Sequence, residues 1–208
     1  MIFLQSPEAI LGIAIALVVG ITFHEFSHAF TADQLGDHRP RAMGRVSLNP
    51  MRHIDPLGAI FFALAGFGWG RPVMVNAYAL RPGPVGMAIV AAAGPIANLV
   101  VAIALAVVYR VLDIAGLDEG GLVMRVVELA VVFNIALGLF NLIPIPPLDG
   151  YNLVLPFLPP RWQYTIQRNL QWGFLLLLLL VILPNSPITW LFRLAFAGGQ
   201  LLTGAGGG

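Results

Sequence analysis

Residues 15–30 read IALVVGITFHEFSHAF, an apolar run with two histidines and a glutamate close to its end. This run is part of a longer apolar segment over about residues 8–33, and about 20 such residues are enough to cross a bilayer as a helix. Neither a basic region nor a small-residue cleavage site accompanies the segment, as they would in a signal peptide. We therefore interpret it as a mature membrane helix.

The composition places the chain among membrane proteins. Of its 208 residues, 58% are hydrophobic and only 10% are charged, and the mean hydropathy is +0.86. A soluble domain carries about 25% charged residues. The 11 cationic residues are scattered arginines, whereas a nucleic-acid-binding protein clusters its cations on one face. We therefore expect the lipid bilayer as its surroundings and no nucleic-acid partner. The lack of cysteine excludes disulfides, thiolate metal ligands and a cysteine nucleophile.

Hydropathy and arginine distribution together predict a topology. Three further long apolar segments cover about residues 84–112, 122–145 and 169–195. The connections that carry arginine are 34–55, 70–83 and 151–168. Because positive residues mark the cytoplasmic side, we place these connections inside and the arginine-free 113–121 loop outside. Both termini are then expected outside.

A shorter apolar segment at 56–69 starts and ends on the same predicted side. A length of about 14 residues favours a re-entrant or interfacial element over a spanning helix, and its glycines suit a hairpin. The predicted fold class is thus an all-α polytopic membrane protein with about four transmembrane helices and this one short element. We expect a single domain over residues 1–203 and a disordered tail at 204–208.

His24-Glu25-Phe26-Ser27-His28 has the H-E-x-x-H pattern of zinc peptidases. Side chains at positions i and i+4 share one face of a helix, so both imidazoles can reach one metal ion, and Glu25 can act as a general base on water. The alternative is a chance match. Since one ionisable residue in the middle of a membrane helix costs about 2.5–3.5 kcal/mol, three polar groups in five residues favour a shared metal.

Catalytic zinc commonly has three protein ligands, and Asp149 is the best candidate for the third. The 122–145 segment runs from outside to inside on the predicted topology, and His24 and His28 also lie near the inner end of their helix, so all three are expected at similar depth. The alternative reading of Asp149 is a turn residue before Gly150. The prolines at 144, 146 and 147 predict an extended stretch that could pair with a substrate strand.

Three other polar residues in or near apolar segments leave alternatives open. Asn141 could donate a hydrogen bond to the oxyanion of the reaction or bond to a neighbouring helix. For the Gly94-Pro95-Ile-Ala-Asn98 stretch, close helix packing is favoured over a role in the site. His53 is interpreted as a loop histidine in preference to a group that supports the metal.

At these residues the chain resembles the site-2 protease family of intramembrane zinc metalloproteases, in a compact form without a PDZ or nucleotide-sensing domain. The resemblance covers about residues 20–150. It depends on the H-E-x-x-H stretch and on NLIPIPPLDG at 141–150, supported by GRVSLNP at 44–50.

The resemblance implies one zinc ion per chain, held by His24, His28 and Asp149, with Glu25 activating water and Asn141 holding substrate or oxyanion. It also implies cleavage in or near a transmembrane segment of a protein substrate, either in regulated intramembrane proteolysis or in peptide clearance. The expected location is a prokaryotic cytoplasmic membrane, with the active site towards the cytoplasm. Two alternatives remain: a membrane protein that binds metal without hydrolysis, and a silent scaffold for partner helices. The oligomeric state stays open.

Overall fold

The computed structural model describes residues 7–58, 70–118, 120–183 and 186–205. Every regular element among these residues is a helix, and the β-type pairing found there is an isolated antiparallel bridge between Ile54 and Gly70. The prediction of an all-α fold is therefore confirmed.

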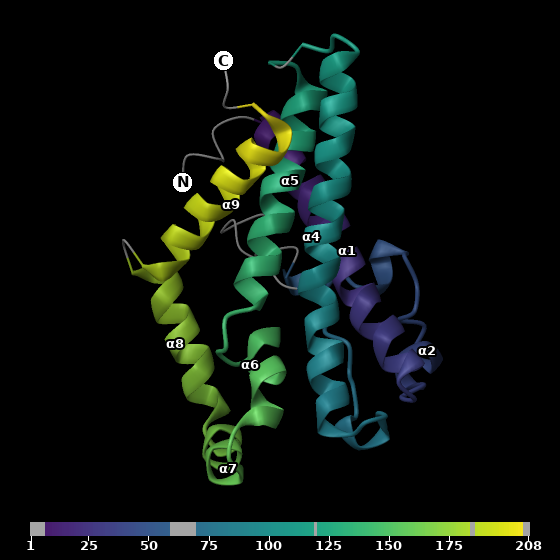
Figure 1. The fold of residues 1–208 in the computed structure, drawn as a ribbon, viewed down its shortest axis with the longest axis vertical. Coiled ribbons are helices and arrows are strands. Elements are labelled where there is room, and N and C mark those ends of the chain that lie inside the picture. The colour runs from purple at the N-terminus through teal and green to yellow at the C-terminus, as the bar shows by residue number, and fades with distance from the viewer. Residues whose placement is uncertain (1–6, 59–69, 119, 184–185, 206–208) are drawn as a thin grey trace.

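Three helices form the centre of the molecule: α1 (Pro7–Gln34), α4 (Pro84–Ile114) and α5 (Leu122–Asn141). Each is long and apolar enough to cross a membrane, and each packs against the other two (Figure 1). Small residues such as Ala102 and Ala106 of α4 are buried where α4 meets α5. Such residues let membrane helices approach closely, since packing and not the hydrophobic effect drives their association.

The fourth predicted span, 169–195, differs from the prediction. It is divided between α8 (Leu170–Ile182) and α9 (Pro187–Thr203), so a count of four spanning helices is not confirmed. Pro187 begins α9, and Ser186 before it is extended. Proline disfavours helical backbone in the residue that precedes it, which explains why one continuous helix does not form. The two helices follow one another along the long axis of Figure 1, with a bend between them.

Shorter helices gather at one end of the three-helix centre: α2 (Arg39–Ala42), α6 (Asp149–Val154) and α7 (Pro160–Arg168). Three single-turn 3-10 helices complete the described elements: η1 (Pro50–Arg52), η2 (Ala77–Ala79) and η3 (Leu155–Phe157). The connection between α4 and α5 lies at the opposite end (Figure 1). This arrangement agrees with the predicted grouping of the arginine-bearing connections on one side. Most of the predicted 56–69 element, and residues 206–208 of the predicted tail, lie outside the described residues.

Two buried aspartates anchor the polar connections to the end of α1. Asp33 accepts from Arg41, with Nη2 2.6 Å from Oδ2, and from Nδ1 of His38 at 2.9 Å. Asp37 accepts two hydrogen bonds of 2.8 Å from the Arg39 side chain and one of 2.7 Å from the backbone N–H of Asn76. The Asn76 bond ties the segment after residue 70 to the turn that follows α1.

Candidate metal centre

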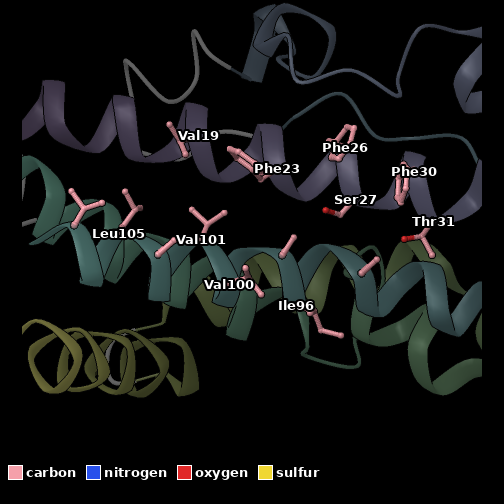
Figure 2. Close-up of a pocket in the computed structure, with 14 residues that line it drawn as sticks. Val19, Phe23, Phe26, Ser27, Phe30, Thr31, Ile96, Val100, Val101 and Leu105 are labelled. Carbon is pink, nitrogen blue, oxygen red and sulfur yellow. The ribbon is translucent and has the colours of Figure 1, made fainter.

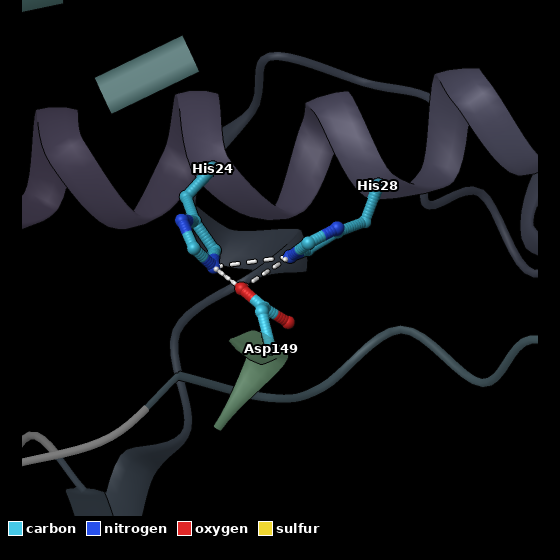
Figure 3. Close-up of side chains that lie close together, drawn as sticks. All are labelled: His24, His28 and Asp149. Carbon is cyan, nitrogen blue, oxygen red and sulfur yellow. Dashed lines mark hydrogen bonds and ion pairs between the residues drawn. The ribbon is translucent and has the colours of Figure 1, made fainter. Parts of the chain in front are cut away.

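Three side chains converge on one point between α1 and α6 (Figure 3). Oδ2 of Asp149 lies 3.0 Å from Nε2 of His24 and 3.1 Å from Nε2 of His28, and the two Nε2 atoms are 3.0 Å apart. His24 and His28 are buried, and the Asp149 side chain is 18% exposed. Among the described residues these three form a group whose ligand atoms lie close enough to share one metal ion.

The outer nitrogens of both imidazoles are held by hydrogen-bond acceptors. Nδ1 of His28 donates to the backbone carbonyl of Val90 at 2.7 Å, and Nδ1 of His24 donates to Oδ1 of Asn98 at 2.7 Å. With the proton on Nδ1, each neutral ring has its lone pair on Nε2, directed towards Asp149. Two imidazole lone pairs and a carboxylate oxygen that face one another are a donor set that fits a divalent metal.

Gly94 of α4 provides the space that the two imidazoles occupy. A Cβ atom at this position would lie 2.6 Å from Cε1 of His24 and 2.6 Å from Cε1 of His28, closer than nonbonded carbons approach. Because α4 has only a hydrogen here, its backbone can pack directly against the ring pair. The glycine is therefore a condition for placing both ligands on the buried face of α1.

Asp149 reaches the centre through the turns that follow α5. The backbone between Asn141 and Asp149 forms hydrogen-bonded turns, for example Leu148 N–H to Ile145 O at 2.9 Å, and Asp149 is the first residue of α6. The predicted extended stretch is thus wrong, since the local bonds fold it into turns. Gly150 packs so tightly on the carbonyls of Leu142 and Ile143 that a Cβ would overlap them.

Glu25 follows His24 on α1 and is partly exposed. Its Oε2 accepts a hydrogen bond of 3.2 Å from the backbone N–H of Val73. The segment that contains Val73 is also held by Asp37 through Asn76. Residues 73–76, which the Glu25 carboxylate faces, are thus held at two points: the Val73 N–H bonds to Glu25 and the Asn76 N–H bonds to Asp37.

His53 does not belong to the three-residue group among the described residues. The Asn141 side chain donates to the carbonyl of Leu137 in its own helix at 3.0 Å. His53 is fully buried, its Nε2 donates to the carbonyl of Ser47 at 2.6 Å, and its Nδ1 has no partner among the described residues. The side chain of His53 thus bonds within the 45–55 connection that contains it.

Asn98, which bonds to His24, is the site residue that the sequence analysis missed. The small residues of the 94–98 stretch favoured a role in helix packing for that stretch. The signal available was its polarity near the middle of an apolar helix, where an amide needs hydrogen-bond partners.

A groove of about 620 Å³ lies on a different face of the α1–α4 pair (Figure 2). Its lining is almost entirely apolar and includes Phe23, Phe30 and Ile96, with the hydroxyls of Ser27 and Thr31 as its polar groups in Figure 2. None of the three converging side chains lines it.

Comparison with known proteins gives the family. The model of peptidase family M50 matches residues 114–182, a segment that contains Asn141 and Asp149. The Bacillus subtilis protein named "Putative zinc metalloprotease YwhC" is 34% identical over 196 residues, which are 90% of this chain and 89% of the relative.

Two mycobacterial relatives named "Putative zinc metalloprotease Rip2" are similarly close. The protein of Mycolicibacterium smegmatis is 33% identical over 201 residues, 91% of this chain and 75% of its own length. That of Mycobacterium tuberculosis strain H37Rv is 34% identical over 222 residues, 94% of this chain and 83% of its own. No solved structure matches. From the extent of these matches, together with its fold, the chain belongs to peptidase family M50, the site-2 protease family.

Proposed function

We propose that the chain is an intramembrane zinc endopeptidase that hydrolyses peptide bonds in or near transmembrane segments of membrane proteins. The observation that carries the proposal is the convergence of His24, His28 and Asp149, with ligand atoms 3.0–3.1 Å apart, on helices of a membrane domain. Two imidazoles and a carboxylate are a ligand set found in catalytic zinc sites. The relatives' names agree with zinc as the metal.

Zinc bound by these ligands would polarise the substrate carbonyl and make water a stronger acid. The rest of the chemistry belongs to the chain. Glu25, next to His24 on the same helix, accepts a proton from the attacking water and later passes it to the leaving amine. The Val73 N–H keeps the Glu25 carboxylate oriented, with the two atoms 3.2 Å apart.

Asn141 is proposed to stabilise the oxyanion. Its Nδ2 carries two hydrogens, and the bond to Leu137 O uses one of them. The second can donate to an oxygen that becomes negative during attack, where a single such donor typically contributes about 10²–10³ in rate.

The substrate must present an extended segment, because the hydrogen bonds of a regular helix shield its peptide bonds. The arginine-bearing connections lie at the same end of the molecule as α6, which carries Asp149. Positive residues mark the cytoplasmic side, so we place the site towards the cytoplasm of a prokaryotic inner membrane. Release of a regulatory protein and clearance of membrane peptides would both use this chemistry.

The test compares Glu25→Gln with wild type in liposomes that contain a labelled single-span substrate. The variant should keep one zinc per chain and lose about 10²–10⁴ in cleavage rate, the usual contribution of a general acid–base group. Asp118→Asn is the matched control, because Asp118 is an exposed carboxylate of the connection between α4 and α5, outside the metal group, and should leave cleavage intact.

Two outcomes contradict the proposal. Unchanged cleavage by Glu25→Gln would exclude this residue as the base. Zinc binding without cleavage by the wild type, across a panel of single-span substrates, would favour a metal-binding protein that does not hydrolyse peptides.

A further inference from the structure

A chain of hydrogen bonds connects α5 to the metal centre through two buried amides. Asn98 of α4 and Asn134 of α5 are both 0% exposed. Nδ2 of Asn98 donates to Oδ1 of Asn134 at 3.1 Å and to the carbonyl of Gly20 at 3.0 Å, and Nδ2 of Asn134 donates to the carbonyl of Ala130 at 2.8 Å. At the other end, Oδ1 of Asn98 accepts from Nδ1 of His24 at 2.7 Å.

The direction of every bond in this chain is determined by the backbone. The carbonyls of Gly20 and Ala130 can only accept, so both amide nitrogens must face them. The oxygen of Asn98 is then left facing His24, and it can only accept the Nδ1 proton. A reversed Asn98 amide would place the proton of His24 on Nε2, the atom directed towards Asp149.

We propose that Asn98 is a positioning residue of the metal centre: it selects the tautomer of His24 that can bind the metal, and Asn134 fixes Asn98 in the required orientation. The inference rests on the zinc site proposed above. In this proposal α5 affects two of the ligands. Asn134 of α5 acts on His24 through Asn98, and the turns that follow α5 lead to Asp149.

The expected effect follows from other metal sites, where removal of the group that orients a ligating histidine costs about 10–100-fold in metal affinity. A structural role predicts something different. Asn98→Leu leaves Asn134 Oδ1 without its donor, and an unsatisfied buried polar group destabilises the fold. Replacing Asn134 by leucine as well removes this unmatched oxygen, which can restore stability without restoring an acceptor for His24.

The experiment measures zinc affinity of the purified full-length protein in detergent, by competition with a chromophoric chelator, together with thermal unfolding. We expect Asn98→Leu and the double variant Asn98→Leu/Asn134→Leu to bind zinc about 10–100-fold more weakly than wild type. Asn98→Asp should bind zinc more tightly than the leucine variants, because one carboxyl oxygen still accepts from His24, although its other oxygen faces two acceptors and destabilises the fold. Thr203→Val is the control, a buried hydroxyl at the end of α9 that bonds to the carbonyl of Gly199 and the N–H of Ala205 and takes no part in the chain to His24.

Wild-type affinity in the double variant would overturn the inference, and so would equal losses in Asn98→Asp and the leucine variants. The double variant keeps the test decisive where Asn98→Leu alone fails to fold. The readout is independent of proteolysis: a wild type that binds zinc and cleaves nothing refutes the proposed function while the affinities still decide the role of Asn98.

Discussion

Replacing Gly94 with alanine tests whether the two imidazoles occupy the position seen in the structure. The new Cβ would lie 2.6 Å from Cε1 of both His24 and His28. Nonbonded carbons prefer separations of about 3.5–4.0 Å, so one or both rings must move by roughly 1 Å. Metal–ligand distances vary by only about 0.2 Å. A shift of this size is therefore incompatible with the full set of ligands.

The magnitude can be bounded from the cost of overpacking. Inserting a methyl group into a well-packed interior typically costs about 1–3 kcal/mol. If that cost falls on the metal-bound state, in which the rings are not free to rotate away, zinc affinity drops by about 5- to 140-fold. In the metal-free state the rings can turn aside, and alanine in a helix interior is favoured over glycine by about 1 kcal/mol. Metal-free Gly94→Ala should thus be nearly as stable as wild type.

The assay is chelator competition on Gly94→Ala, with Gly198→Ala as the matched control. Gly198 also lies inside a helix, and its added Cβ would meet only Ile135 Cδ1, at an ordinary 3.5 Å. Wild-type zinc affinity in Gly94→Ala would refute the reasoning, because it would mean that the ligated rings do not pack against α4. Equal losses in both variants would point to a general effect of adding methyl groups.

Two further changes test the ligand set and the anchor of the segment beside Glu25. Asp149→Ala removes one of three ligands and should lower bound zinc, measured per chain after dialysis, from about one to near zero, whereas retained zinc would place the third ligand elsewhere. Hydrogen bonds from the Arg39 guanidinium lower the pKa of Asp37 from 3.8 to about 2, against the opposing effect of burial. The Asp37 contribution to stability is therefore complete above about pH 4 and is lost as the pH falls through about 2. Asp37→Asn should unfold at a lower temperature than wild type at pH 7, and the difference should disappear at the acid end; a difference independent of pH would contradict the ionic origin.

The ligand pair on α1 is the part of the site that the sequence predicts most directly. His24 and His28 are four residues apart, and helix geometry alone places them on one face. Asp149 required one more step, the inference of equal depth from arginine distribution, and the structure places its Oδ2 within 3.1 Å of both Nε2 atoms. Local periodicity and charge bias are sufficient for residues whose position follows from secondary structure and topology.

The contacts of Asn98 and Gly94 could not be predicted in this way, because they depend on how α4 is rotated about its axis. A helix that is apolar all round carries little periodic signal for its rotation, since lipid and protein neighbours accept the same side chains. The division of the fourth predicted span has a local cause at Pro187, but hydropathy averaged over a window conceals such a break. Rotation and breaks both emerge only from packing.

The ligands of the centre are therefore placed by two different mechanisms. The His24–His28 spacing is a property of one continuous helix and survives changes elsewhere in the chain. The position of Asp149 depends on where α5 ends, on the turns that follow and on Gly150 packed against two carbonyls. In our proposal α5 also fixes the tautomer of His24, through Asn134 and Asn98. A helix that carries no ligand therefore affects both the histidine and the aspartate ligands. Substitutions in α5 can then abolish metal binding while the H-E-x-x-H sequence stays intact.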